Sequence, residues 1–256
     1  MYTPRNYFAS ATEQRRALEA CDIFEASELR LYDASVCAFD SSSSAEEAFR
    51  CFLYIYYELA SPGPPSHWNV FRPFSPAECW PPEKIFETIK REFSEFSRYG
   101  TVNLMSFGKS GTARHLQSCL LTMSAMKPKK KGFPIMTVSK FLHFYNAALF
   151  PIYDEKVIWK KVCDGYFRSD FRDFCYGESL PYQRFKDDDT VDFVPAYMRW
   201  ASSLLSVAPG GFMQVFTGWL GEQPGADLGR RNFDVTTLYA RAFEYTAVGA
   251  AQAEGW

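Results

Sequence analysis

The segment from Phe133 to Trp159 constrains the fold more than any other part of the chain, because it contains two helix starts separated by a proline turn. One helix is predicted over 138–147, with Lys140 at its beginning, and the next over 154–164, with Asp154 as its first residue. The turn between them ends the first helix, since a residue before proline avoids helical backbone angles. Both polar side chains are therefore expected at helix N-termini, where the positive end of the helix dipole favours anions.

The remaining pattern predicts an all-α protein. Ser10 with Glu13, and Ser44 with Glu47, form capping boxes ahead of helices at roughly 11–30 and 44–60. Proline in a first helical turn indicates a further helix from Pro82, whose apolar stripe is Ile85, Ile89, Phe93 and Phe96. More helices are predicted at about 112–125, 191–207 and 233–251. The best strand candidate is 102–107.

Composition narrows the class of protein. With 256 residues and 47% hydrophobic content, the chain can bury a substantial core. Its formal net charge of only -2 means that a nucleic-acid site must be a local patch. The chain contains neither a membrane-length apolar run nor a signal peptide, so a cytoplasmic protein with no membrane partner is expected. Its seven cysteines form no Cys-x-x-Cys pair and its three histidines have no ligand spacing, so no metal and no cofactor are expected.

The order of lysine, apolar helix, proline turn, aspartate and valine-containing helix resembles the helix-hairpin-helix DNA glycosylases, as a divergent prokaryotic member. This superfamily includes the 8-oxoguanine and alkylated-base glycosylases. Residues 137–140 (TVSK) match the exit of the hairpin and 151–157 (PIYDEKV) match the aspartate turn. The likeness covers about 30 residues. It departs from the family pattern where 132–136 (GFPIM) replaces the glycine-rich hairpin and where Tyr153 is inserted before the aspartate.

The resemblance implies a two-lobed helical DNA glycosylase with a degenerate hairpin. The whole chain, 1–256, would be one catalytic unit and a monomer, with one lobe at 80–180 and the other formed by 1–79 plus 181–256. The enzyme would extrude a damaged or modified base from double-stranded DNA and hydrolyse its N-glycosidic bond, which leaves an abasic site. A repair role and antiviral defence against hypermodified viral DNA both fit this reading.

Two residues carry the implied chemistry. Asp154 would stabilise the positive charge that develops on the deoxyribose and orient the attacking water. Lys140 would either form a Schiff base with the sugar, which adds lyase activity, or hold a phosphate as a cation. Each residue also has an alternative role without chemistry. Aspartate is a preferred helix N-cap, and a lysine in a helix is usually solvated.

Other residues complete the hypothesis. A lysine run ahead of the site is typical of a clamp for the DNA backbone, and flat side chains near the site could hold the extruded base. The predicted DNA-binding residues are Lys127, Lys129, Lys130, Lys131, Lys109 and Ser139, and the predicted base-pocket residues are Tyr145, Tyr153, Trp159 and His143. The alternatives are a non-enzymatic DNA-binding protein that reads modified bases on the same scaffold, and a helical protein-interaction module.

Overall fold

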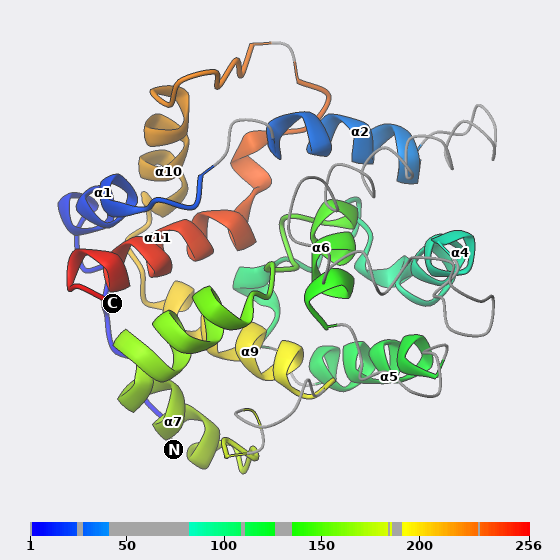
Figure 1. Ribbon diagram of the computed structural model, residues 1–256, viewed down its shortest axis with the longest axis horizontal. Helices are drawn as coiled ribbons and strands as arrows, with labels where there is room; N and C mark the ends of the chain where they lie inside the picture. The colour runs from blue at the N-terminus through cyan, green and yellow to red at the C-terminus, as the bar shows by residue number, and fades with distance from the viewer. Residues whose placement is uncertain are drawn as a thin grey trace.

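In the computed structural model, the described part of the chain is helical and contains no strand (Figure 1). The structure describes residues 2–24, 28–40, 82–108, 111–125, 135–183, 185, 191–229 and 231–256. Its helices are α1 (Ala11–Ala20), α2 (Glu28–Asp40), α4 (Pro82–Glu92), α5 (Thr112–Ser124), α6 (Ile135–Tyr145), the π-helix η4 (Glu155–Tyr166), α7 (Arg168–Gly177), α9 (Phe193–Ser206), α10 (Phe212–Gly221) and α11 (Tyr239–Ala253). Three short 3-10 turns are η2 (Ser94–Phe96), η3 (Leu104–Ser106) and η5 (Val235–Thr237).

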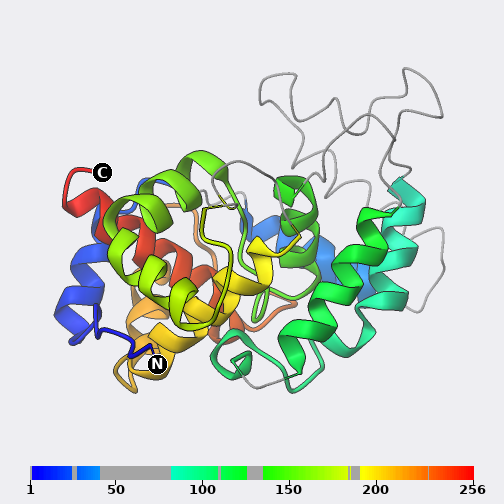
Figure 2. The same cartoon turned by 90° about the horizontal axis from the view of Figure 1, so that it is seen from below.

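Helix α11 is the centre of one half of the molecule. It contacts α1 and η4 most extensively, and also α10, so helices from the beginning, middle and end of the chain meet along it (Figure 1). Nearly every face of α11 is buried, which is typical of a helix inside a core rather than on its surface. The other half contains α4, α5 and α6, which lie at the opposite end of the molecule in both views (Figure 2).

Gly249 explains how α1 and α11 pack so closely. A Cβ atom at this position would lie 1.8 Å from the Ala17 carbonyl oxygen of α1. Only a residue without a side chain allows the two backbones to approach to this distance, so the packing of the two helices depends on this glycine.

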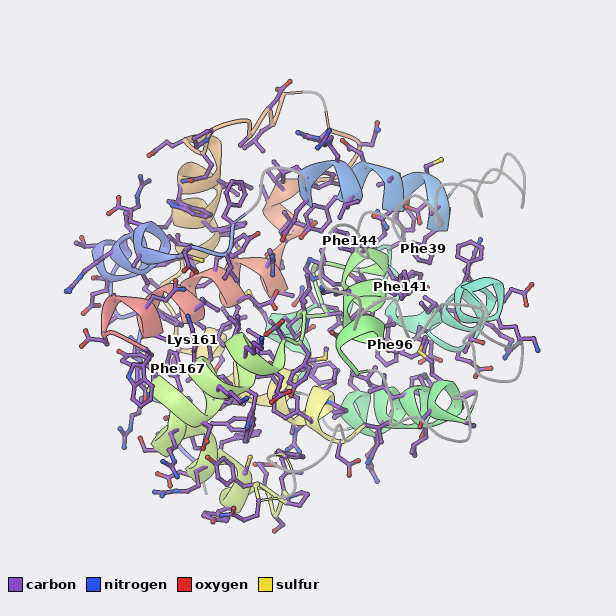
Figure 3. The ribbon with its side chains drawn as sticks, viewed as in Figure 1. Phe39, Phe96, Phe141, Phe144, Lys161 and Phe167 are labelled. Atoms are coloured by element: carbon purple, nitrogen blue, oxygen red, sulfur yellow. The ribbon has the colours of Figure 1, made fainter. Side chains whose placement is uncertain are left out.

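Aromatic side chains fill the core between α7, α9 and α11. Trp200 is fully buried, and its ring lies 5.2 Å from Phe171 and 5.9 Å from Phe243 between ring centres. The Trp200 indole N–H donates a hydrogen bond to the buried Asp170 carboxylate at 2.8 Å, and the Tyr2 hydroxyl donates to the same oxygen at 2.5 Å. The N-terminal segment is thereby attached to α7. A second group of buried aromatic residues includes Phe141 and Phe144 of α6, Phe39 of α2 and Phe96 of η2 (Figure 3).

Several sequence predictions are confirmed. Helix α4 begins at Pro82, and the stripe residues Ile89, Phe93 and Phe96 are buried. Ser10 caps α1, since its hydroxyl accepts a hydrogen bond from the Glu13 N–H. The second predicted capping box, at Ser44, and its helix at 44–60 lie outside the described residues.

Other predictions need correction. The expected single helix at 11–30 is two helices, because α1 ends at Ala20 and the backbone of Cys21 is extended. The strand candidate at 102–107 contains η3 instead. Asn103 and Ser106 cap this turn reciprocally, and such local side-chain bonds compete with a strand. No helix of the described residues combines the length and apolar character needed to cross a membrane.

Candidate functional site

The turn between α6 and η4, residues 146–154, is held by hydrogen bonds from several parts of the chain. The Ala147 carbonyl accepts from the Ala240 N–H at 3.2 Å, and the Ala148 carbonyl accepts from the Leu104 N–H at 2.8 Å. The Asn146 side chain donates to the Phe96 carbonyl at 2.9 Å and accepts from the Ala148 N–H at 3.0 Å. This loop therefore has a fixed backbone, as a site that positions a reactive group requires.

Ser139 connects α6 to the last part of this turn. Its hydroxyl oxygen accepts a hydrogen bond from the Tyr153 N–H at 2.9 Å, and the serine is buried. The residues directly after this pair are Lys140 and Asp154, which the sequence predicts to act together. The hydroxyl of Ser139, predicted to touch DNA, is thus used within the fold.

Asp154 caps the N-terminus of η4. Its Oδ1 accepts hydrogen bonds from the N–H groups of Lys156 at 2.8 Å and Val157 at 3.0 Å. The side chain is partly exposed, and its second oxygen, Oδ2, accepts no hydrogen bond from the described residues. One carboxylate oxygen therefore fixes the orientation of the group, and the other is available to a ligand.

Lys140 is not at a helix N-terminus, which corrects the sequence prediction. Helix α6 begins at Ile135, three residues before the predicted start, so Lys140 lies beyond its first turn. In the sequence, Pro134 directly precedes Ile135, and proline is frequent where helices begin. The effect of the helix dipole decreases within the first turn, so it does not act on Lys140 as it acts on Asp154.

The structure places the four predicted base-pocket residues in the core. His143, Tyr145, Tyr153 and Trp159 are all buried. The Tyr145 hydroxyl donates to the Phe93 carbonyl at 3.2 Å, and the rings of Tyr153 and Trp159 both pack against Phe193, at 4.8 and 5.6 Å between centres. These side chains stabilise the turn and η4 from inside.

His143 has a structural role in this core. Its Nδ1 donates to the Phe150 carbonyl and its Nε2 accepts from the Tyr32 hydroxyl, both at 2.5 Å, in the tautomer that satisfies both partners. Burial lowers the pKa of His143 to about 3, so the imidazole is neutral at physiological pH. It links α2, α6 and the turn that precedes Asp154.

The predicted basic clamp cannot be placed. Lys109, Lys127, Lys129, Lys130 and Lys131 lie outside the described residues. Three further lysines, which are not among the predicted DNA-binding residues, lie on η4, the helix that Asp154 caps. Lys156 and Lys160 are exposed. Lys161 is partly exposed on the same helix (Figure 3). Their helical spacing directly after the aspartate was the signal that could have found them.

Helix η4 has the wide turns of a π-helix. The Asp154 carbonyl accepts from the N–H groups of both Ile158, at 2.7 Å, and Trp159, at 3.2 Å. At the other end, the Phe167 N–H donates to the Val162 carbonyl at 2.9 Å, five residues back. Such turns occur frequently at functional sites, because they displace side chains from the usual helical positions.

A buried charged group supports the turn from α11. The Arg241 guanidinium binds the Glu28 carboxylate of α2 and donates to the Glu244 carboxyl group at 3.3 Å. Glu244 is fully buried, and burial raises its pKa to about 8 against the opposing effect of Arg241. The nearby Ile152 amide favours the charged form of this carboxylate. The sequence signal for this group was a pair of charges inside an otherwise apolar helix.

Within the described ranges, no three His, Cys, Asp or Glu side chains gather closely enough to bind a metal ion. Comparison with known proteins found no matching family model, no matching curated protein and no matching solved structure.

Proposed function

We propose that this chain is a DNA N-glycosylase that excises a damaged or modified base, with Asp154 as its catalytic carboxylate. The observation that carries the proposal is the position of this carboxylate. Oδ1 is fixed by two backbone N–H groups of η4, while Oδ2 has no partner among the described residues. A group held in this way can orient a water molecule and oppose developing positive charge without first reorganising.

The chemistry of glycoside cleavage requires such a group. As the bond between sugar and base lengthens, the anomeric carbon gains positive charge, which a nearby carboxylate stabilises. The same oxygen can accept the proton of the water that attacks the sugar. The rigid backbone of the turn supports this role, because displacement of a catalytic group by even about 1 Å reduces the rate strongly.

The lysines of η4 support DNA as the substrate. Lys156 and Lys161 share the helix that Asp154 caps, and no ion pair to the described residues engages either of them. Lys160, in contrast, lies 3.0 Å from Glu155. Phosphate contacts from such side chains would position a DNA backbone without reading its sequence. In the proposal, Lys140 and the lysines between 127 and 131 extend this contact.

The decisive experiment measures base release. Duplexes that carry single damaged or hypermodified bases are incubated with the protein and then treated with alkali, which breaks the strand at an abasic site. Breaks that wild type produces should decrease by about 10²- to 10⁴-fold in Asp154→Asn, the loss expected for an acid/base group. The matched control is Glu155→Gln, which removes the neighbouring exposed carboxylate and should leave the rate unchanged. Full activity of Asp154→Asn would exclude the assigned role.

Two further outcomes distinguish the related possibilities. Borohydride trapping of a protein–DNA adduct that disappears in Lys140→Ala would assign lyase activity to this lysine, whereas no adduct would leave a simple hydrolase. Specific binding to a modified duplex without any strand breaks would show that the protein reads modified bases and does not excise them.

A further inference from the structure

A cavity of about 200 Å³ lies between the C-terminal end of α6, the end of α2 and the segment that leads into α11. Neither Asp154 nor any residue that the sequence predicted to hold the extruded base is part of its lining. A cavity of about 150 Å³ is large enough for benzene in another protein, so this one has room for a planar ring.

The polar lining of the cavity includes an ion pair that has hydrogen-bonding atoms without a partner among the described residues. Arg98 Nε lies 3.2 Å from Asp40 Oδ2, and both side chains are more than four-fifths buried, with 18% and 15% of their surface exposed. Arg98 Nη2 donates to the Ser35 hydroxyl at 2.9 Å and to the Phe144 carbonyl at 3.0 Å. Asp40 Oδ2 also accepts from the Tyr99 hydroxyl at 3.1 Å.

These contacts fix the pair but leave polar atoms of both groups without a hydrogen bond. Within the described part of the chain, Arg98 Nε lies near Asp40 without a hydrogen bond, and neither Arg98 Nη1 nor Asp40 Oδ1 makes one. A charged donor and a charged acceptor are therefore available on two groups that line the same cavity. Burial lowers the pKa of Arg98 and raises that of Asp40, which is the desolvation that strengthens hydrogen bonds to either group.

Part of the cavity wall is aromatic. The ring of Tyr32 lies 4.9 Å from Phe144 and 5.0 Å from Phe233 between centres, and all three residues line the space. Tyr99 is 77% exposed and lies where the cavity meets solvent. Aromatic faces favour a flat ligand, because offset and edge contacts between rings add to the gain from buried area.

We infer that this cavity binds a planar heterocycle whose edge carries a hydrogen-bond acceptor beside a donor, as a nucleobase does. The acceptor receives the Arg98 Nη1 proton and the donor N–H contacts Asp40 Oδ1, while the ring lies among Tyr32, Phe144 and Phe233. The site is separate from Asp154, and its occupation requires no base release. Its ligand could come from a free nucleoside or from an unpaired base of single-stranded DNA, and both present the same edge.

The test measures binding by calorimetry and by the ligand-induced rise in melting temperature. The ligands are thymidine and inosine, and the matched ligand controls are 3-methylthymidine and 1-methylinosine, whose ring donor is blocked and whose bases carry no exocyclic amine. Wild type should bind at least one unmodified nucleoside at least about tenfold more tightly than its methylated form, since a blocked donor leaves the Asp40 oxygen unpaired. A third arm uses single-stranded oligothymidine to distinguish a base in DNA from a free nucleoside.

Two variants locate the site. Val36→Phe fills the cavity from α2 without removing a polar group, and its matched control is Val215→Phe on α10, outside the cavity. Asp40→Asn keeps the shape but removes the negative charge, and its control is the exposed Asp173→Asn on α7. The two cavity variants should each weaken binding at least about tenfold, with the controls unchanged. If one cavity variant does not fold, the other still provides the test.

Binding of the methylated nucleosides as tight as that of the parents would overturn the inference. So would undiminished binding by a folded Val36→Phe protein, or no binding of either nucleoside at about 1 mM. Each measurement records binding alone, so a failure of the excision reaction leaves this test unaffected. Oligothymidine binding that is lost in Val36→Phe would identify single-stranded DNA as the source of the ligand, whereas binding of nucleosides only would identify a free molecule.

Discussion

The Tyr153 N–H donates a hydrogen bond to the Ser139 hydroxyl at 2.9 Å, 14 residues earlier in the chain. This contact ties the end of the aspartate turn to α6, in addition to the hydrogen bonds that His143 and Asn146 make within and beyond the turn. The turn is therefore positioned by tertiary structure as much as by its proline.

Loss of this contact should be measurable in stability. Ser139→Ala removes the oxygen that accepts the hydrogen bond of the buried Tyr153 N–H, which should lower the free energy of unfolding by about 1–3 kcal/mol. The control is Ser118→Ala on α5, where an exposed hydroxyl returns a hydrogen bond to its own helix, and the change there should be below about 0.5 kcal/mol. Urea unfolding measures both. Equal effects in the two variants would mean that the contact contributes nothing specific.

Asp154 should have separable structural and chemical roles. Asparagine caps a helix about as well as aspartate, so Asp154→Asn should change the free energy of unfolding by less than about 0.5 kcal/mol, whereas Asp154→Ala should lower it by about 1 kcal/mol. Thermal unfolding of the two variants checks this difference. If Asp154→Asn is as unstable as the alanine variant, its loss of base release could no longer be attributed to chemistry alone.

Two helical glycines should respond to alanine with opposite signs. Gly249→Ala places a methyl group against the Ala17 carbonyl and should lower the free energy of unfolding by more than about 3 kcal/mol. Gly218→Ala on α10 meets no atom within 4 Å and should raise it by about 0.5–1 kcal/mol, because alanine loses less entropy in a helix. Chemical denaturation of the pair tests the close approach of α1 and α11. A Gly249→Ala protein as stable as wild type would contradict that geometry.

Stability should depend on pH through Glu244. The carboxyl of Glu244 titrates near 4.5 when unfolded but at about 8 in the fold. The folded state therefore keeps a proton that the unfolded state has lost, and the free energy of unfolding should fall as pH rises between these values. His143 acts in the opposite direction between pH 3 and 6.5, because its pKa is lowered from 6.5 to about 3.

The two groups can be separated above pH 6.5, where His143 no longer contributes. Between this pH and about 8, urea unfolding of wild type should show stability falling with pH. Glu244→Gln should remove that fall, since an amide resembles the protonated acid. Glu19→Gln, at an exposed position of α1, serves as the reference and should keep the decrease in stability with rising pH. The same slope in all three proteins would contradict a raised pKa for Glu244.

Local signals predicted the local structure well. Pro82 and its apolar stripe were sufficient to place α4, and the capping preference of aspartate was sufficient to place the N-cap of η4 at Asp154. These features depend on residues within a few positions of one another, where propensity and periodicity are informative.

Long-range relationships could not be predicted in this way. Glu28 and Arg241 are 213 positions apart, and Arg98 binds Ser35 across 63 positions, so no local pattern connects them. Burial of Tyr153 and Trp159 likewise depends on Phe193 of α9. The sequence predicted flat side chains near the aspartate, but it could not distinguish rings packed in the core from rings that face a ligand. Helices α7 and α10 were also missed.

The position of α11 has a consequence for biosynthesis. The helix at 239–253 packs against α1, the first helix of the chain, and against η4 near its middle. During translation, the apolar faces of these earlier helices stay exposed until the residues beyond 239 have left the ribosome. Chains whose contacts join distant positions fold slowly, and their hydrophobic surface stays exposed until folding is complete. Newly made copies of this protein should therefore depend on chaperones more than copies of a protein with mainly local contacts do.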